Sequence, residues 1–135
     1  MKIIVIDCFS GISGDMFLSS LIDAGLDFNE LNKQLNLLKL ENYNIKIIPA
    51  KSHGLSGTRL KIITNEHQLT HRHLSDIEKI INQSNLKSNI KKCALNIFYN
   101  LARAEAKVHG ITPEKVHFHE VGAVDSIIDI VGAAI

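Results

Sequence analysis

The chain has 135 residues, with 15 Lys and Arg against 14 Asp and Glu, and a formal net charge of +1. A charge this balanced gives no electrostatic footprint for nucleic acid or an anionic membrane, so we expect neither as a partner. The length predicts one domain over residues 1–135 with a single core.

The first predicted element is a strand over residues 2–9, KIIVIDCF. A continuous apolar run of this length is typical of a central strand that is buried on both faces. Asp7 interrupts the run. Because an unpaired carboxylate is costly to bury, Asp7 is expected to have a partner or a cation beside it.

A glycine-containing turn, SGISGD, follows this strand and leads into a helix. A strand, a turn and a helix in this order can direct free backbone N–H groups at an anion such as phosphate. The spacing is neither a P-loop nor a dinucleotide motif, because the lysine of the first and the third glycine of the second are missing. The alternative is a tight turn with glycines at positive φ and Ser13 as the helix cap. The candidate residues are Ser10, Gly11, Ser13, Gly14 and Asp15.

The middle of the chain predicts helices around a hairpin, which gives an α+β fold. We expect a small sheet of about three strands, the first strand plus the hairpin, packed against several helices. The hairpin strands are residues 43–50, an edge strand because of Pro49, and 58–64. The helices begin at Asp27, at Leu74 or Ser75, and near residue 88, and the last ends at Gly110. Its apolar stripe is expected at Ile90, Ala94, Ile97, Leu101, Ala104 and Val108.

A histidine cluster precedes the third of these helices, in EHQLTHRHLSD. The spacing of His67, His71 and His73 resembles a loose metal-collecting loop. A solvated loop that enters a helix explains the same residues.

The last quarter, HFHEVGAVDSIIDIVG, contains the densest group of candidate ligands. On an extended segment His117 and His119 share one side, and on a helix Asp125 and Asp129 share one face. Two carboxylates so placed repel unless something cationic lies between them. The alternative is that the histidines are ordinary polar strand residues and that Asp125 is a helix N-cap.

An apolar helical stripe formed by Ile127, Ile128, Val131 and Ile135 is still in phase where the sequence stops. No capping residue follows it. We therefore expect a fragment of a longer protein, with self-association into a homo-oligomer through this helix or fraying of its last turn.

Localisation is predicted from the absence of export and membrane patterns. The apolar runs fall short of the roughly 18 residues that a membrane-spanning helix needs, and Asp7 interrupts the only candidate signal-peptide core. Cys8 and Cys93 lie far apart in apolar patterns, which favours reduced core thiols. We expect a soluble cytoplasmic protein.

Three segments, DCFSGISGDM, HRHLSDI and AEAKVHG with VHFHEVGAVDSIIDIVG, together resemble the N-terminal part of the LarC-type nickel insertion proteins. These are the pyridinium-3,5-bisthiocarboxylic acid mononucleotide nickel chelatases. The segments stand in family order and span nearly the whole chain. Family members are longer, so the resemblance implies that a C-terminal region is missing and that this piece alone is inactive.

The resemblance implies a lyase-type nickel chelatase, or cyclometallase, that inserts nickel(II) into the pyridinium mononucleotide and hydrolyses CTP. The product is the nickel-pincer nucleotide cofactor of lactate racemase, which would be the recipient. Imidazole holds nickel adequately, but the softer sulfurs of the substrate would take it over, which gives the transfer a direction.

The resemblance also implies roles for the candidate residues. Mg²⁺ or Mn²⁺ would accompany CTP on the side of Asp7, Asp15 and the glycine turn, because these ions prefer oxygen ligands. Glu120 or Asp125 would be the base that removes a ring proton. The nickel ligands would be His117 and His119, with His71 and His73 as further candidates.

Two other classes of function use the same residues. A metal-dependent phosphohydrolase would place two ions on water and phosphate. A non-catalytic nickel-binding delivery module would need the histidines but no nucleotide.

Overall fold

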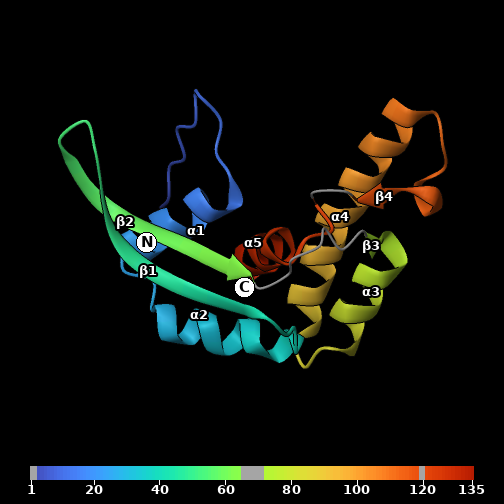
Figure 1. Cartoon of the computed structure of the whole chain (residues 1–135), viewed down its shortest axis with the longest axis horizontal. Coiled ribbons are helices and arrows are strands. Elements are labelled where there is room, and N and C mark those ends of the chain that lie inside the picture. The colour runs from blue at the N-terminus through green and yellow to red at the C-terminus, as the bar shows by residue number, and fades with distance from the viewer. Residues whose placement is uncertain (1–2, 65–71, 119–120) are drawn as a thin grey trace.

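The computed structural model describes residues 3–64, 72–118 and 121–135 (Figure 1). The arrangement of helices and short antiparallel strands confirms the predicted α+β fold. In chain order the elements are α1 (Gly14–Asp23), α2 (Phe28–Leu35), the 3-10 turn η1 (Asn36–Leu38), β1 (Tyr43–Ser52), β2 (Leu55–Thr64), β3 (Arg72–His73), α3 (Leu74–Gln83), α4 (Ser88–His109), the 3-10 turn η2 (Pro113–Lys115), β4 (His117–Phe118) and α5 (Val124–Ala134).

The hairpin of β1 and β2 is longer than predicted. It pairs continuously from Tyr43 opposite Thr64 to Ser52 opposite Leu55, so the expected loop is mostly strand. His53 and Gly54 both have positive φ, 49° and 84°, which suits a two-residue turn that follows the strand twist. Pro49 does lie on an edge strand, because among the described residues β1 pairs only with β2.

The helix boundaries follow their sequence signals. Asp27 caps α2 by accepting a hydrogen bond from the Asn29 N–H at 2.9 Å. Gly110 ends α4 in the left-handed conformation, as predicted. The buried stripe of α4 differs from the predicted one after Ala94, because it continues in steps of four residues. It comprises Ile90, Ala94, Phe98, Ala102 and Ala106.

The predicted strand over residues 2–9 is the main error in the fold. Residues 3–8 form no strand with any part of the chain that the structure describes, and the segment loops away from the helices before α1 (Figure 1). Ile3 is 71% exposed and Phe9 is 93% exposed. A strand is stable only where neighbouring strands take up its N–H and C=O groups, and neither described sheet includes this segment. We call residues 3–9 the N-terminal arm.

Exposure also corrects the prediction for the cysteines and for α5. Cys8 lies on the arm and Cys93 on the outer face of α4, and both are exposed, so neither belongs to the core. In contrast, Ile127, Ile128 and Val131 are fully buried although we expected their stripe to lack a cover. Helix α5 packs on α4, α1 and α2, which supply that cover. No helix in the described part of the chain is long and apolar enough to cross a membrane.

Candidate functional site

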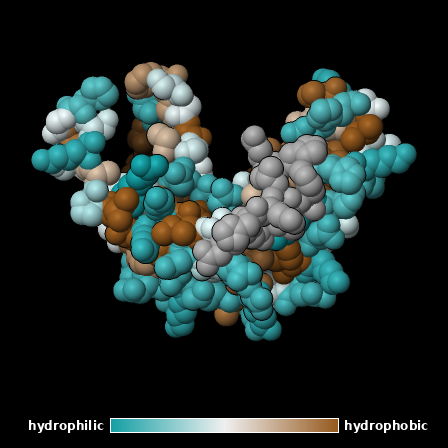
Figure 2. Space-filling view, in the orientation of Figure 1, coloured by the Kyte–Doolittle hydropathy of each residue, from teal (hydrophilic) through white to brown (hydrophobic). Residues whose placement is uncertain are grey.

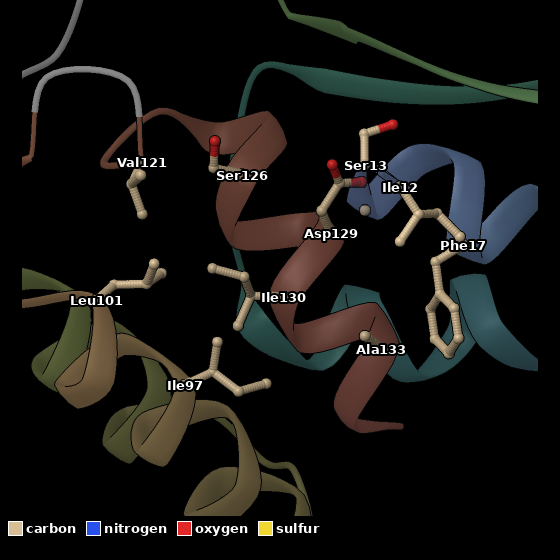
Figure 3. Close-up of a pocket in the computed structure, with 11 residues that line it drawn as sticks. Ile12, Ser13, Phe17, Ile97, Leu101, Val121, Ser126, Asp129, Ile130 and Ala133 are labelled. Atoms are coloured by element: carbon tan, nitrogen blue, oxygen red, sulfur yellow. The ribbon is translucent and has the colours of Figure 1, made fainter. Parts of the chain in front are cut away.

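A pocket of about 360 Å³ lies where α5 meets the start of α1 and the middle of α4. Figure 3 shows that Ile97 and Leu101 approach it from α4, whereas Ile12 and Phe17 approach it from the side of α1. Ile97 and Leu101 are only half-buried because the core stripe of α4 has turned away from them. The polar part of the lining comprises Ser13, Ser126 and Asp129.

Asp129 is the ionisable residue in the lining of this pocket, and its pKa is raised. Its burial and the negative charges of Asp15 and Asp125 raise its pKa from 3.8 to about 7. A hydrogen bond from the Asp15 backbone N–H acts in the opposite direction, because it stabilises the ionised form. Among the described residues, the buried Oδ1 of Asp129 has no hydrogen-bond partner. The carboxyl therefore holds a proton more tightly than an exposed aspartate does.

Gly14 allows α5 to approach α1 this closely. A Cβ atom at Gly14 would lie 2.5 Å from Cβ of Asp129 and 2.8 Å from its Oδ2, distances that real atoms do not adopt. Gly132, one turn further along α5, meets Leu18 of α1 in the same way, since an added Cβ would lie 2.8 Å from Cδ1 of Leu18. These glycines therefore serve helix packing.

This contact changes the interpretation of the glycine turn. A protein carboxyl group, that of Asp129, lies against Gly14 at the start of α1, which is where a phosphate was expected. Gly11 has a φ of 86° and donates its N–H to the Cys8 carbonyl at 2.8 Å, as expected for a tight turn. The turn is therefore largely explained by local structure.

The side chains of the turn are also engaged locally. The Ser13 hydroxyl donates to Oδ1 of Asp15, and the Met16 N–H donates to the same oxygen at 2.9 Å. Ser13 occupies the N-cap position, but its side chain does not cap the helix. Ser10 and Asp7 are exposed on the loop before α1. The argument that assigned Asp7 to a cation depended on burial, and that premise is wrong.

The two histidine segments, in contrast, do come together. Strands β3 and β4 lie side by side (Figure 1) and pair antiparallel with His73 opposite His117. The centroids of the two imidazole rings are 3.9 Å apart. His117 is exposed and His73 is half-buried, so a ligand can reach the pair from solvent. His73 is also the N-cap residue of α3, and its backbone N–H donates to Oδ2 of Asp76 at 2.9 Å. One histidine from each of the two predicted segments thus belongs to a single pair, whereas His67, His71 and His119 lie outside the described residues.

Arg72 of β3 contacts Gly122, which lies shortly before α5. The Arg72 side chain donates through Nη1 to the Gly122 carbonyl at 2.6 Å. A Cβ atom at Gly122 would lie 2.7 Å from the Phe118 carbonyl oxygen, so only glycine fits there. Gly122 is thereby held against Arg72 of β3. Val121, which precedes Gly122, also lines the pocket. The pocket therefore lies beside the contact between Gly122 and β3.

Neither group is a complete metal centre among the described residues. Within residues 3–64, 72–118 and 121–135, no three His, Cys, Asp or Glu side chains lie close enough together to hold an ion. The predicted ligands His71 and His119 and the predicted base Glu120 lie outside the described residues. The other predicted base, Asp125, is exposed in the first turn of α5.

Asp129 is the site residue that the sequence analysis did not select. Its spacing from Asp125 is a weaker indication than the apolar sequence around it. Asp129 stands inside the apolar run IIDIVG and within one turn of buried residues on both sides. A carboxylate in that position is seldom without a specific contact.

Comparison with known proteins identifies relatives over the whole chain. A protein of Desulfitobacterium hafniense is 51% identical over 135 residues and one of Akkermansia muciniphila is 50% identical over 143, each covering all of this chain. Both are pyridinium-3,5-bisthiocarboxylic acid mononucleotide nickel insertion proteins. The chain spans about a third of their length, 33% and 35% respectively. No solved structure matches the chain.

The match to the family is equally extensive. The model of the family described as nickel insertion protein matches residues 4–135, which include both histidine strands, the pocket and the glycine turn. The chain therefore belongs to the nickel insertion protein family.

Proposed function

We propose that a protein of the relatives' full length, containing this chain, inserts nickel into pyridinium-3,5-bisthiocarboxylic acid mononucleotide. Family membership over residues 4–135 supports this proposal, and the relatives from Desulfitobacterium and Akkermansia have names that state this reaction. The observation that carries it in the structure is the pairing of His73 with His117. The product would be the nickel-pincer cofactor that lactate racemase receives.

In this proposal nickel is a substrate, and the histidine pair holds it before transfer. Neutral imidazoles bind nickel(II), and the exposed position of His117 leaves the ion open to an incoming ligand. The thiocarboxylate sulfurs of the mononucleotide are softer donors, so they would draw the ion from the histidines. His71 and His119 belong to the same proposed ligand set.

The nucleotide side of the reaction concerns the aspartates at the start of the chain. Hydrolysis of CTP with Mg²⁺ or Mn²⁺ is part of the proposal, with Asp7 and Asp15 as the proposed ligands. Yet Oδ1 of Asp15 accepts two hydrogen bonds within its own turn, and the negative charge of Asp15 acts on the nearby Asp129 carboxyl, whose pKa it helps to raise. The described residues alone do not fit such an ion, and we assign no catalytic step to it. Glu120 or Asp125 remains our proposal for the base that accepts the ring proton.

The experiment replaces both histidines of the pair, His73→Ala with His117→Ala, in the full-length protein. Nickel affinity, measured by titration calorimetry, should fall at least about 10-fold, as expected when ligand contacts are lost. His109→Ala is the matched control, because His109 is exposed and its Nε2 lies 3.3 Å from Oε2 of Glu105. Equal nickel affinity in the double variant and the control would remove the pair from the nickel role.

A second measurement separates this function from its alternatives. Mass spectrometry of the mononucleotide, after incubation with nickel and CTP, should show nickel incorporated by the full-length protein. Nickel binding without incorporation would favour a delivery module. Turnover of simple phosphate esters without nickel would favour a phosphohydrolase. The Asp129 carboxyl of α5, which lies against Gly14 at the start of α1, argues against a phosphate site there.

A further inference from the structure

The N-terminal arm exposes several neighbouring apolar side chains to solvent. Ile3, Ile4, Val5 and Ile6 are each more than half exposed, and Val5 is 86% exposed. Figure 2 shows the arm as a projection with open space on either side, unlike the close-packed helices below it. Large contiguous apolar patches of this kind mark interaction sites.

The backbone of the arm makes few hydrogen bonds to the described residues. Within the described residues, the backbone hydrogen bond found here is the local one from the Gly11 N–H to the Cys8 carbonyl. Residues 3–6 thus present a run of N–H and C=O groups on a segment rich in β-branched residues. Such a segment can add to the edge of a sheet, because the added strand satisfies these groups.

The pattern of the side chains limits what the partner can be. Successive residues of a strand point to opposite faces, and residues 3–6 are apolar at every position. The partner must therefore supply both a neighbouring strand and a covering layer on each face. The arm of a second copy supplies one strand and no layers, so it does not meet this requirement.

The relatives contain a further stretch of polypeptide that is long enough to do so. This chain corresponds to 33% of the Desulfitobacterium relative, and the remaining two thirds lie outside the match. A region of that size can form a sheet with two covered faces. We propose that the N-terminal arm is a strand of a second sheet, whose other strands come from the part of the full-length protein that lies outside the matched third.

Hydrogen exchange tests this proposal on two proteins. One is the 135-residue chain, and the other is a chimera in which this chain replaces the matched third of the Desulfitobacterium relative. The amides of residues 4–6 should exchange about 100-fold more slowly in the chimera, because strand pairing protects them. Equal exchange rates in the two proteins would overturn the proposal. So would protection in the short chain that grows with its concentration, because that result would identify a second copy as the partner.

Two matched substitutions give an independent measurement. Val5→Asp and Val108→Asp each place a charge at a highly exposed valine, since Val108 is 79% exposed near the end of α4. In the short chain, neither change should shift the urea midpoint of unfolding appreciably. In the chimera, Val5→Asp should lower the midpoint or prevent folding, whereas Val108→Asp should not. A midpoint for Val5→Asp equal to that of the unsubstituted chimera would contradict a buried strand at the arm.

Discussion

The N-terminal arm and helix α5 are both rich in isoleucine and valine, yet the structure treats them differently. Ile127 and Ile128 of α5 are fully buried against α1, α2 and α4, whereas Ile3 and Val5 of the arm face solvent. A helix satisfies its own backbone hydrogen bonds and needs only side-chain cover. A strand also needs neighbouring strands. Packing within this chain therefore completes α5 but not the arm.

The comparison predicts that replacing a β-branched residue by alanine changes the free energy of unfolding much more in α5 than in the arm. Ile128→Ala should lower the free energy of unfolding of the short chain by about 2–5 kcal/mol, because it leaves a cavity in the core. Val5→Ala should change it by less than about 0.5 kcal/mol, because no packing is lost. Urea denaturation followed by circular dichroism measures both. A cost for Val5→Ala close to that of Ile128→Ala would show that the arm is packed in the short chain.

A smaller effect is expected where α5 touches α1. Gly14→Ala should destabilise the protein by about 1–3 kcal/mol through the clash with Asp129, partly offset by a gain of about 1 kcal/mol in helix propensity. Gly57→Ala in β2 is the control, because nothing lies within 4 Å of its added Cβ. If the two variants were equally stable in thermal denaturation, the close approach of α5 to α1 would be wrong.

The smallest expected effect is the pH dependence that Asp129 gives to α5. Its folded pKa is about 7 and its ordinary value is 3.8, so the folded state binds the proton more tightly. The resulting stability is fully present below about pH 4 and is lost as the pH rises through 7. Because the carboxyl is only partly buried, solvent screening reduces the contribution to about 1–2 kcal/mol.

Asp129→Asn should remove this component, so that the variant gains stability relative to the wild type between pH 4 and pH 8. Asp7→Asn on the exposed arm is the matched control and should leave the pH dependence of unfolding unchanged. Urea midpoints at several pH values provide the measurement. Parallel curves for the D129N variant and the wild type would show that Asp129 carries no unusual proton.

The sequence by itself determined the elements that depend on local signals. The Asp27 cap, the Gly110 terminator and the alternating strands of the hairpin specify conformations within a few residues, so their predicted places are confirmed. The family is also determined at this level, because its motifs stand in order along the chain and the match covers residues 4–135.

Tertiary structure alone decided which of these elements meet. Only the pairing of β3 with β4 brings His73 to His117 across 44 positions of sequence, 117 minus 73. Only the packing of α5 on α1 places the Asp129 carboxyl against Gly14 of the glycine turn, at the helix start where a phosphate was expected. The apolar pattern of a segment indicates that it must be buried, but it does not identify the element that covers it. For that reason the same reasoning misjudged both the arm and α5, whose surroundings depend on residues far away in the sequence.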